Sequence, residues 1–263
     1  MESDPAVVPA GITELINVDE EQQLELIRGG IATIEEEVRR LGDEEAVHDL
    51  DYVLNQKSSM KEYDNGVRDE GREGMTLADF LSLPECQEAK LKEVEVAALR
   101  FYSSKSFLHV TAPVRDLKRR DRGETVPLPA TTIHVVNGLK KLRRVGSTED
   151  DATVEKIFFR GVKNLRITDE FAKRGGTELA PMSTTFDLKV AVRYGMSRNS
   201  IIFRIVTMNN LQRGSNIAHI SVFPKESEVL FAPLTFLQPT GRSQVLKLAG
   251  ITVTVVEVTP TTS

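Results

Sequence analysis

The chain has 263 residues, of which 40% are hydrophobic and 28% charged, and these globular proportions exclude a wholly disordered protein. Its net charge of −5 combines −11 in residues 1–50 with +6 in the remainder, a basic surplus too small for general nucleic-acid binding. The single cysteine, Cys86, excludes an intrachain disulfide and a four-cysteine metal site, and the four histidines stand at no metal-ligand spacing, so we expect no metal.

The first part of the sequence is acidic and partly helical. Residues 1–11 contain two prolines and no periodicity, whereas apolar residues recur at helical spacing from Ile12 to Leu54, with a break predicted at Gly29-Gly30. Residues 55–75 contain several glycines and are predicted to be a linker or long loop. We therefore interpret residues 1–75 as an N-terminal extension, either packed on the rest of the chain or free to bind a regulatory partner.

A second block of predicted helices follows this extension. Thr76–Asp79 has the form of a capping box, and Pro84 suits the first turn of an amphipathic helix that continues to Phe101. Residues 117–130 are basic and contain prolines, so they are predicted to form a loop. Thr132–Leu142 has helical periodicity again.

Short β-like runs replace the helical pattern from about residue 154. They are Ile157–Phe159, Ile201–Val206, His219–Phe223, Glu228–Phe231, Val245–Leu248 and Ile251–Val258. A turn is predicted at Ala249-Gly250, and one helix at Asp187–Tyr194 with Asp187 as its cap. Early helices and late strands, without regular βαβ alternation, predict an α+β fold.

Two stretches of the strand-rich half carry side chains suited to an anionic ligand. Arg160 ends an apolar strand and precedes Gly161, so a guanidinium group can grip a phosphate where glycine lets a ligand approach the backbone. Ser183, Thr184 and Thr185 precede a helix, where their hydroxyls can cap it or orient a carboxylate and a sugar. Taken alone, each stretch favours a structural role, because strands often end in a solvated arginine and hydroxyl groups before a helix often cap it.

Glu226 and Glu228 form the third stretch. On a strand, residues two apart share a face with Cα atoms roughly 6.5–7 Å apart, and an apolar setting would raise one pKa. A solvated, exposed pair is the simple alternative. An inverting glycosidase also needs two carboxylates at about this separation, but neighbours on one strand do not flank a sugar from opposite sides.

The order of these three stretches resembles the arginine–serine–glutamate branch of the mono-ADP-ribosyltransferases, which includes arginine-specific bacterial toxins and vertebrate ecto-enzymes. The resemblance continues upstream through residues 95–115 and covers residues 76–258. It implies an ADP-ribosyltransferase fold with two facing, mostly antiparallel sheets around an NAD cleft. Its catalytic domain would have a helical part, residues 76–145, and a sheet core, residues 154–258.

The resemblance also implies roles for single residues. Arg160 would bind a phosphate of NAD, with Gly161 giving close approach. Ser183 would position the catalytic glutamate and the nicotinamide ribose. Glu228 would stabilise the oxocarbenium-like ribose as nicotinamide leaves, and Glu226 would hold and help deprotonate the incoming guanidinium group. The catalytic set is therefore Glu228, Glu226, Ser183 and Arg160.

Further contacts follow from the same resemblance. The other cofactor-binding residues that it implies are Thr184, Thr185, Tyr194 and Arg198. Phe223 stands where the family's target-recognition turn has an aromatic residue, so Phe223 and Glu226 would recognise the substrate. A glutamate at the position of Glu226 goes with arginine as the acceptor in the family.

The implied activity is transfer of ADP-ribose from NAD to a protein arginine with release of nicotinamide, and NADP stays open as an alternative to NAD. An NAD glycohydrolase on the same fold would use water in place of arginine. A third interpretation of the function is a catalytically inactive module that binds NAD or a protein. The partners expected are NAD and an arginine-bearing protein of unknown identity.

Signals for membranes and export are missing from the sequence. No apolar run reaches the roughly 18 residues that a membrane span needs, and the acidic start Met1–Pro5 lacks the features of a secretory signal. We therefore expect no membrane or nucleic-acid partner and an intracellular, cytoplasmic location, with non-classical export left open.

Overall fold

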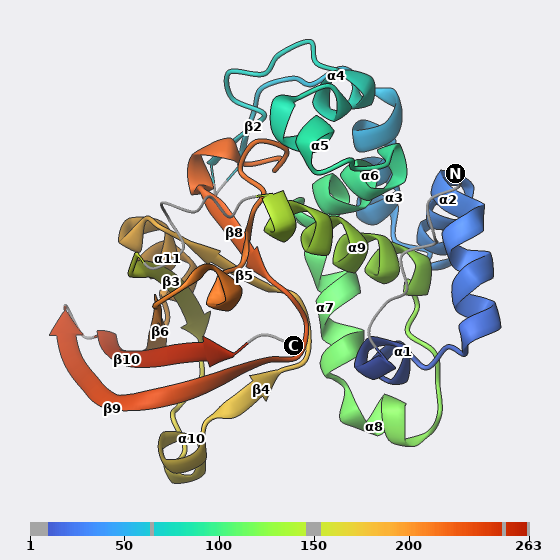
Figure 1. The fold of residues 1–263 in the computed structure, drawn as a ribbon. Helices are drawn as coiled ribbons and strands as arrows, with labels where there is room; N and C mark the ends of the chain where they lie inside the picture. Colours follow the sequence, from blue (N-terminus) through green and yellow to red (C-terminus); the bar gives the residue numbers. More distant parts are fainter. Residues whose placement is uncertain (1–9, 64–65, 146–153, 249–250, 262–263) are drawn as a thin grey trace. The chain divides into compact units, whose positions relative to one another are not determined.

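The computed structural model describes residues 10–63, 66–145, 154–248 and 251–261. The chain forms two compact units that differ in secondary structure (Figure 1). The first comprises Met1–Val145 with His219–Lys225, and the second comprises Gly146–Ala218 with Glu226–Ser263. The boundary near residue 75 between an extension and a catalytic domain concerns function and stays a prediction.

The first unit is built mainly of helices (Figure 1). They are α1 (Ala10–Ile16), α2 (Glu20–Arg40), α3 (Glu44–Asn55), α4 (Leu77–Leu81), α5 (Pro84–Glu88), α6 (Glu93–Tyr102), α7 (Phe107–Arg115), α8 (Leu117–Asp121) and α9 (Pro129–Val145). A short antiparallel hairpin of β1 (Lys61–Tyr63) and β2 (Gly66–Arg68) stands between α3 and α4 in the sequence. No helix among the described residues combines the length and hydrophobicity needed to cross a membrane.

The core of the first unit centres on α6 and α9. Every residue of α6 from Val94 to Tyr102 is buried, so this helix is covered on all sides. A Cβ atom on Gly138 of α9 would lie 2.8 Å from Leu99 Cδ1 of α6. The glycine therefore lets the two helices approach closely, which a larger side chain would prevent.

Several helix boundaries are those that local sequence signals predict. Gly30 has a φ of 59° and interrupts the helical conformation of α2. The Thr76 side chain and the Asp79 side chain form a reciprocal capping box at the start of α4. Pro84 occupies the first turn of α5, where its missing N–H costs no hydrogen bond.

Other segments differ from the prediction. The loop expected over residues 55–75 is interrupted by β1 and β2. The loop expected over residues 117–130 begins with α8, because the Asp116 carboxylate accepts a hydrogen bond from the Arg119 N–H at 3.1 Å and caps the helix. The single helix expected from Pro84 divides into α5 and α6, with Lys90 between them at a φ of 52°.

The segment His219–Lys225 packs in the first unit and contains no strand, so the strand predicted over His219–Phe223 is wrong. Side chains satisfy its backbone in place of a neighbouring strand. Arg72 donates to the carbonyl oxygens of His219 and Ser221, and Arg100 donates to that of Ile220 at 2.9 Å. Backbone carbonyls satisfied in this way need no ladder.

A buried ion pair holds these arginines in place. Arg100 lies 2.8 Å from an oxygen of Asp69, and their side chains are 2% and 0% exposed. The Tyr52 hydroxyl donates to the same carboxylate at 2.5 Å, and the Asp69 N–H donates to the Val222 carbonyl oxygen at 2.7 Å. These contacts compensate for burying the charges, which is otherwise costly.

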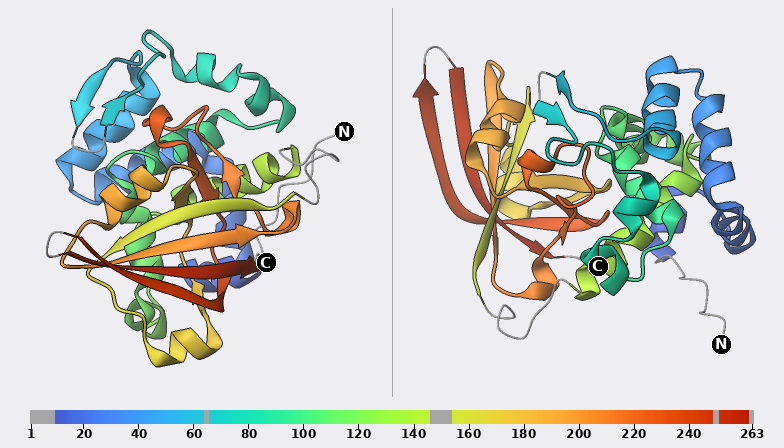
Figure 2. Two further views of the ribbon diagram at one scale, coloured as in Figure 1. Left: turned by 90° about the vertical axis from the view of Figure 1, so that its left-hand side faces the viewer. Right: turned by 90° about the horizontal axis from the view of Figure 1, so that it is seen from above.

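The second unit contains the large sheet. Its strands are β3 (Lys156–Lys163), β4 (Gly176–Glu178), β5 (Met182–Thr185), β6 (Asn199–Thr207), β7 (Ser215–Asn216), β8 (Glu228–Phe231), β9 (Thr235–Leu248) and β10 (Ile251–Thr261). Two helices, α10 (Asp169–Arg174) and α11 (Leu188–Gly195), and the 3₁₀ turn η2 (Asn210–Gln212) connect them, and a second 3₁₀ turn, η3 (Pro224–Glu226), leads into β8. Figure 2 shows β9 and β10 running side by side as a long pair. The predicted turn at Ala249-Gly250 lies outside the described residues.

The eight strands pair in the order β4-β9-β10-β6-β3-β5-β8-β7. Each pair is antiparallel except β10 with β6. The hydrogen-bonding ladder is thus one sheet, where the sequence predicts two. The two halves remain recognisable, because β3 pairs with β6 over its whole length but meets β5 only at Phe159 and Thr185. The core of this unit lies between them, where Phe158 packs edge-on against Phe231 with centroids 5.5 Å apart.

Candidate functional site

The register between β5 and β8 decides which hydroxyl groups meet which carboxylates. Thr185 lies directly opposite Glu228, with Ser183 two residues earlier on β5. Because paired residues share a face and alternate residues return to it, Ser183, Thr185 and Glu228 lie on the same face. Thr184 faces the other way, and its hydroxyl donates to the Val229 carbonyl oxygen at 2.7 Å.

Ser183 and Glu228 are joined by a hydrogen bond. The Ser183 hydroxyl donates to Glu228 Oε1 at 2.7 Å, and Glu228 is only 6% exposed. The Thr185 hydroxyl donates to the backbone carbonyl oxygen of Glu226 at 2.6 Å, which ties β5 to the turn before β8. One carboxylate is therefore held in a fixed orientation at the first residue of a strand.

Arg160 reaches the same place from β3. Its Nη1 donates to the Ser183 carbonyl oxygen at 2.8 Å, and its Nη2 lies 3.8 Å from Glu178 Oε2. The Arg160 side chain is 19% exposed, so part of the guanidinium group faces solvent. The structure thus brings Arg160, Ser183 and Glu228 together, in the combination that the sequence predicts.

Gly161 has a different neighbour from the one expected. A Cβ atom at this position would lie 1.8 Å from the Ala191 carbonyl oxygen and 2.5 Å from the Gly195 N atom. The glycine therefore lets the backbone of α11 pack directly on β3, and this packing explains the residue without a ligand. Its predicted contact with the cofactor stays a prediction.

Glu226 lies in η3 and not on the strand, so the prediction that both glutamates share a strand face is wrong. Ser227, between them, has a φ of 48°, and this left-handed residue separates the turn from β8. Glu226 Oε1 accepts a hydrogen bond from the Tyr194 hydroxyl at 2.8 Å. The same oxygen lies 3.3 Å from Arg193 Nη2, so the end of α11 contacts the carboxylate twice.

The environment of Glu226 changes its acidity. The pKa of Glu226 is raised from 4.5 to about 7, mainly by burial and also by the negative charge of Glu228. The hydrogen bond from Tyr194 and the positive charge of Arg193 lower the pKa and partly oppose these effects. A carboxyl group with a pKa near 7 can both bind a cation and accept a proton at neutral pH.

Two further predicted residues, Arg198 and Phe223, have other neighbours. Arg198 is exposed in the turn before β6, where its carbonyl oxygen accepts a hydrogen bond from the Thr252 N–H at 3.3 Å. Phe223 belongs to the first unit, is 3% exposed and packs edge-on against Tyr63 with centroids 5.9 Å apart. No described contact joins either side chain to Arg160 or Glu228.

Two residues of the group are absent from the sequence prediction. Arg193 could have been suspected, because it precedes Tyr194 in the last turn of the helix that follows the hydroxyl stretch. Glu178 carries no local signal, since only the folding of β4 and β5 brings it to Arg160. Among the described residues, no group of three or more histidine, cysteine, aspartate or glutamate side chains could hold a metal ion.

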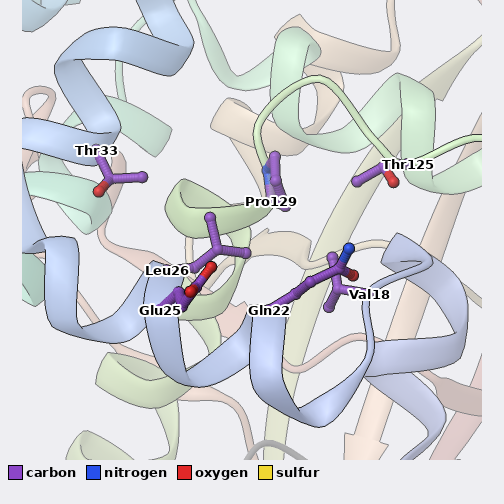
Figure 3. A pocket seen from close by; sticks show the side chains of 7 residues that line it. All are labelled: Val18, Gln22, Glu25, Leu26, Thr33, Thr125 and Pro129. Atoms are coloured by element: carbon purple, nitrogen blue, oxygen red, sulfur yellow. The ribbon is translucent and has the colours of Figure 1, made fainter.

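A separate hollow of about 350 Å³ lies in the first unit beside α2 (Figure 3). Its lining side chains are Val18, Gln22, Glu25, Leu26, Thr33, Thr125 and Pro129. Glu25 is the ionisable group among them, and none of the predicted site residues contributes. This lining offers no acid–base pair for catalysis.

Comparison with known proteins adds a family match. A family model described as NAD:arginine ADP-ribosyltransferase matches residues 27–258. The match therefore begins within the segment interpreted above as an extension. No curated protein matches the chain.

Solved structures give the same fold. The ADP-ribosyltransferase HopU1 of Pseudomonas syringae pv. Tomato DC3000 has a TM-score of 0.51 and 15% identity, over 82% of this chain and 97% of that one. The eucaryotic mono-ADP-ribosyltransferase ART2.2 has a TM-score of 0.52 and 14% identity, over 95% of this chain and 94% of that one. At such identities the likeness establishes the fold, and the predicted α+β ADP-ribosyltransferase fold is confirmed.

Proposed function

The chain belongs to the NAD:arginine ADP-ribosyltransferase family, and from this we propose that it transfers ADP-ribose from NAD to an arginine side chain of a protein. NAD-dependent mono-ADP-ribosylation is the activity that the family and the fold support. Arginine as the acceptor and the role of each residue are our proposal. The observation that carries it is the pair of differently held glutamates, Glu228 on Ser183 and Glu226 on Tyr194 and Arg193.

The first step is cleavage of the bond between nicotinamide and ribose. Arg160 holds a phosphate of NAD, for which a partly exposed guanidinium group is suited. Ser183 holds the Glu228 carboxylate by the 2.7 Å hydrogen bond, so the negative charge does not need to reorient as the ribose becomes cationic. A fixed charge in a buried position stabilises such a transition state strongly.

The second step is attack by the acceptor. Glu226 binds the guanidinium group of the target and takes its proton as nitrogen bonds to the ribose. A pKa of about 7 makes Glu226 a stronger base than an exposed glutamate while leaving a useful fraction ionised at neutral pH. Tyr194 keeps this carboxylate oriented through its hydroxyl group. Thr184, Thr185, Arg198 and Phe223 remain proposed as supporting contacts, and residues 76–258 as the catalytic domain.

The test is nicotinamide release from NAD with and without agmatine, a soluble guanidine. We expect agmatine to stimulate release in the wild type, and Glu228→Gln to reduce release by about 10²–10³-fold, the usual cost of removing one transition-state stabiliser. Glu257→Gln is the matched control, because Glu257 pairs with Arg204 on strands separated from β5 by β3.

Nicotinamide release at the wild-type rate by a folded Glu228→Gln variant would contradict the proposed role of Glu228. Release that ignores agmatine but disappears in the mutant would identify an NAD glycohydrolase. No release in any sample would favour a binding module. Replacing NAD by NADP in the same assay decides between the two nucleotides.

A further inference from the structure

The carboxylate proposed to bind the acceptor is already in contact with a guanidinium group of this chain. Arg193 Nη2 lies 3.3 Å from Glu226 Oε1, the oxygen that also accepts the Tyr194 hydrogen bond. Arg193 belongs to the last turn of α11, and Glu226 is the last residue of η3. Arg193 therefore occupies the position in which the proposed function places a substrate arginine.

Arg193 is held much less tightly than the structural arginines. Its side chain is 43% exposed, reaches one oxygen of the carboxylate and otherwise lies over the Tyr194 ring at 5.9 Å from the ring centre. Arg100, by comparison, is 2% exposed and donates to both oxygens of Asp69 and to a carbonyl group. One ion pair and one distant ring contact on a half-exposed side chain stabilise it little, so Arg193 can move within reach of the carboxylate.

We propose that Arg193 is itself an acceptor and that the protein ADP-ribosylates it within the same molecule. This inference rests on the proposed function, because it uses the same two glutamates. Arginine next to the anchoring carboxylate has the advantage of a high effective concentration over any free guanidine. The modified residue would be an N-glycoside of ADP-ribose on a guanidinium nitrogen.

The step balances without a further reactant. The bond between the ribose C1′ and the pyridinium nitrogen of NAD breaks, and neutral nicotinamide leaves with the bonding electron pair. A terminal nitrogen of Arg193 forms the new bond to C1′, while Glu228 stabilises the cationic ribose. The proton lost from Arg193 passes to Glu226 and then to solvent. No oxidation or reduction takes place.

Other arginines near the site are less suited to this reaction. Arg160 donates to the Ser183 carbonyl oxygen and lies near Glu178, so it is engaged on the side proposed for the NAD phosphate. Arg198 has no described contact with either glutamate of the site. The geometry therefore points to one position for the modification.

The experiment incubates the purified full chain with NAD at two protein concentrations. Intact mass measures the addition of one ADP-ribose, and peptide mapping locates it. Transfer to agmatine is measured in the same preparations, so that the proposed function is tested independently. Arg193→Lys keeps the positive charge beside Glu226 but removes the guanidine. Arg174→Lys is the matched control, since Arg174 is also a helical arginine paired with a glutamate, Glu170, at 3.9 Å.

We expect label on Arg193 at a rate per molecule that is independent of protein concentration. Label at this position should be lost in Arg193→Lys, kept in Arg174→Lys and reduced by saturating agmatine, which competes for Glu226. Transfer to agmatine without label on Arg193 would overturn this inference and leave the proposed function standing. Label on Arg193 whose rate per molecule rises with protein concentration would overturn the intramolecular reaction. If neither agmatine nor the chain is labelled, the proposed function fails and this inference fails with it.

Discussion

Two glutamates, one in each unit, have the same raised pKa but are held by different kinds of partner. Burial raises the pKa of Glu37 in the first unit to about 7, the same value as for Glu226 in the second. Glu37 accepts hydrogen bonds from the N–H groups of Ala130 and Thr131 at 2.6 and 3.0 Å, and from the Thr131 hydroxyl at 3.0 Å. Glu226 has the Tyr194 hydroxyl and the half-exposed guanidinium group of Arg193.

The difference shows what a raised pKa does and does not indicate. The partners of Glu37 form the first turn of α9, so this carboxyl group caps a helix other than its own, and its donors cannot leave without unravelling that turn. The partners of Glu226 are the ends of two side chains, and the half-exposed guanidinium group of Arg193 can give way to a substrate. Perturbed acidity alone is therefore weak evidence for catalysis, and the mobility of the hydrogen-bond donors is the better criterion.

The largest effect that tests this comparison is loss of transfer in Glu226→Gln. Glutamine has nearly the same shape but cannot accept the proton of the attacking guanidinium group. We expect transfer to agmatine to fall by about 10²–10⁴-fold, the usual range for removing a general base. The measurement is ADP-ribosyl-agmatine formation, with agmatine-independent nicotinamide release followed in parallel.

Glu37→Gln is the control for that experiment. It replaces a carboxyl group of the same pKa at a place where no chemistry is expected, so transfer should continue at a rate near that of the wild type. Equal losses in the two variants would mean that the assay reports stability, and the proposed distinction between the two glutamates would collapse.

Glu37→Ala should lower the stability of the protein, whereas the main effect of Glu226→Gln is on transfer activity. The substitution leaves three donors at the start of α9 without their acceptor in a buried place. Since each unsatisfied buried group costs about 1–3 kcal/mol, we expect the free energy of unfolding to fall by at least about 3 kcal/mol. Urea unfolding followed by the helical circular dichroism signal measures this, because the first unit is mainly helical. Glu36→Ala, one residue earlier and exposed, should change it little.

The pH dependence of stability tests the raised pKa of Glu37. The folded-state pKa of Glu37 is about 7, above the ordinary 4.5, so the folded state holds the proton more tightly than the unfolded state. The stability from this group is fully present below pH 4.5 and is lost as the pH rises through 7. The loss amounts to at most about 3 kcal/mol. Unfolding at pH 5 and pH 8 should show a smaller difference in Glu37→Gln than in the wild type, and an unchanged difference would contradict the assignment.

Much of the fold follows from signals carried by neighbours in the sequence. The Thr76 and Asp187 caps, Pro84 in a first turn and the break at Gly30 act over one helical turn, so they are visible without a structure. The strand predicted over His219–Phe223 is absent because contacts between residues distant in the sequence determine its structure. Its apolar alternation is typical of a strand, but its carbonyl groups are satisfied by arginines more than a hundred residues earlier.

The residues of the candidate site also divide into those that the sequence predicts and those that only tertiary contacts place. The order of Arg160, Ser183 and Glu228 was sufficient to predict that they meet, and their roles stay predictions. The place of Arg193 before Tyr194 in the sequence hints at a role, but its contact with Glu226 depends on the packing of α11 against Gly161, which is a tertiary contact. The place of Glu226 in a turn was missed because Ser227 adopts a left-handed conformation that serine seldom favours.

The smallest effect expected is that of Tyr194→Phe, which tests how far the partners of Glu226 tune it. The Tyr194 hydroxyl lowers the pKa of Glu226, so its removal should raise that pKa above 7. Because transfer needs the ionised carboxylate, the rising limb of the pH profile for transfer to agmatine should move to higher pH. At neutral pH the rate should fall by about tenfold, the lower end of what one hydrogen bond to a charged group contributes. Agmatine-independent nicotinamide release should keep its profile, because the proposed function assigns that step to Glu228. A profile that does not move would mean that the Tyr194 hydroxyl does not tune the pKa of Glu226 and that Tyr194 only packs beside it. Glu226 would then differ from Glu37, whose pKa is lowered by its backbone donors in α9.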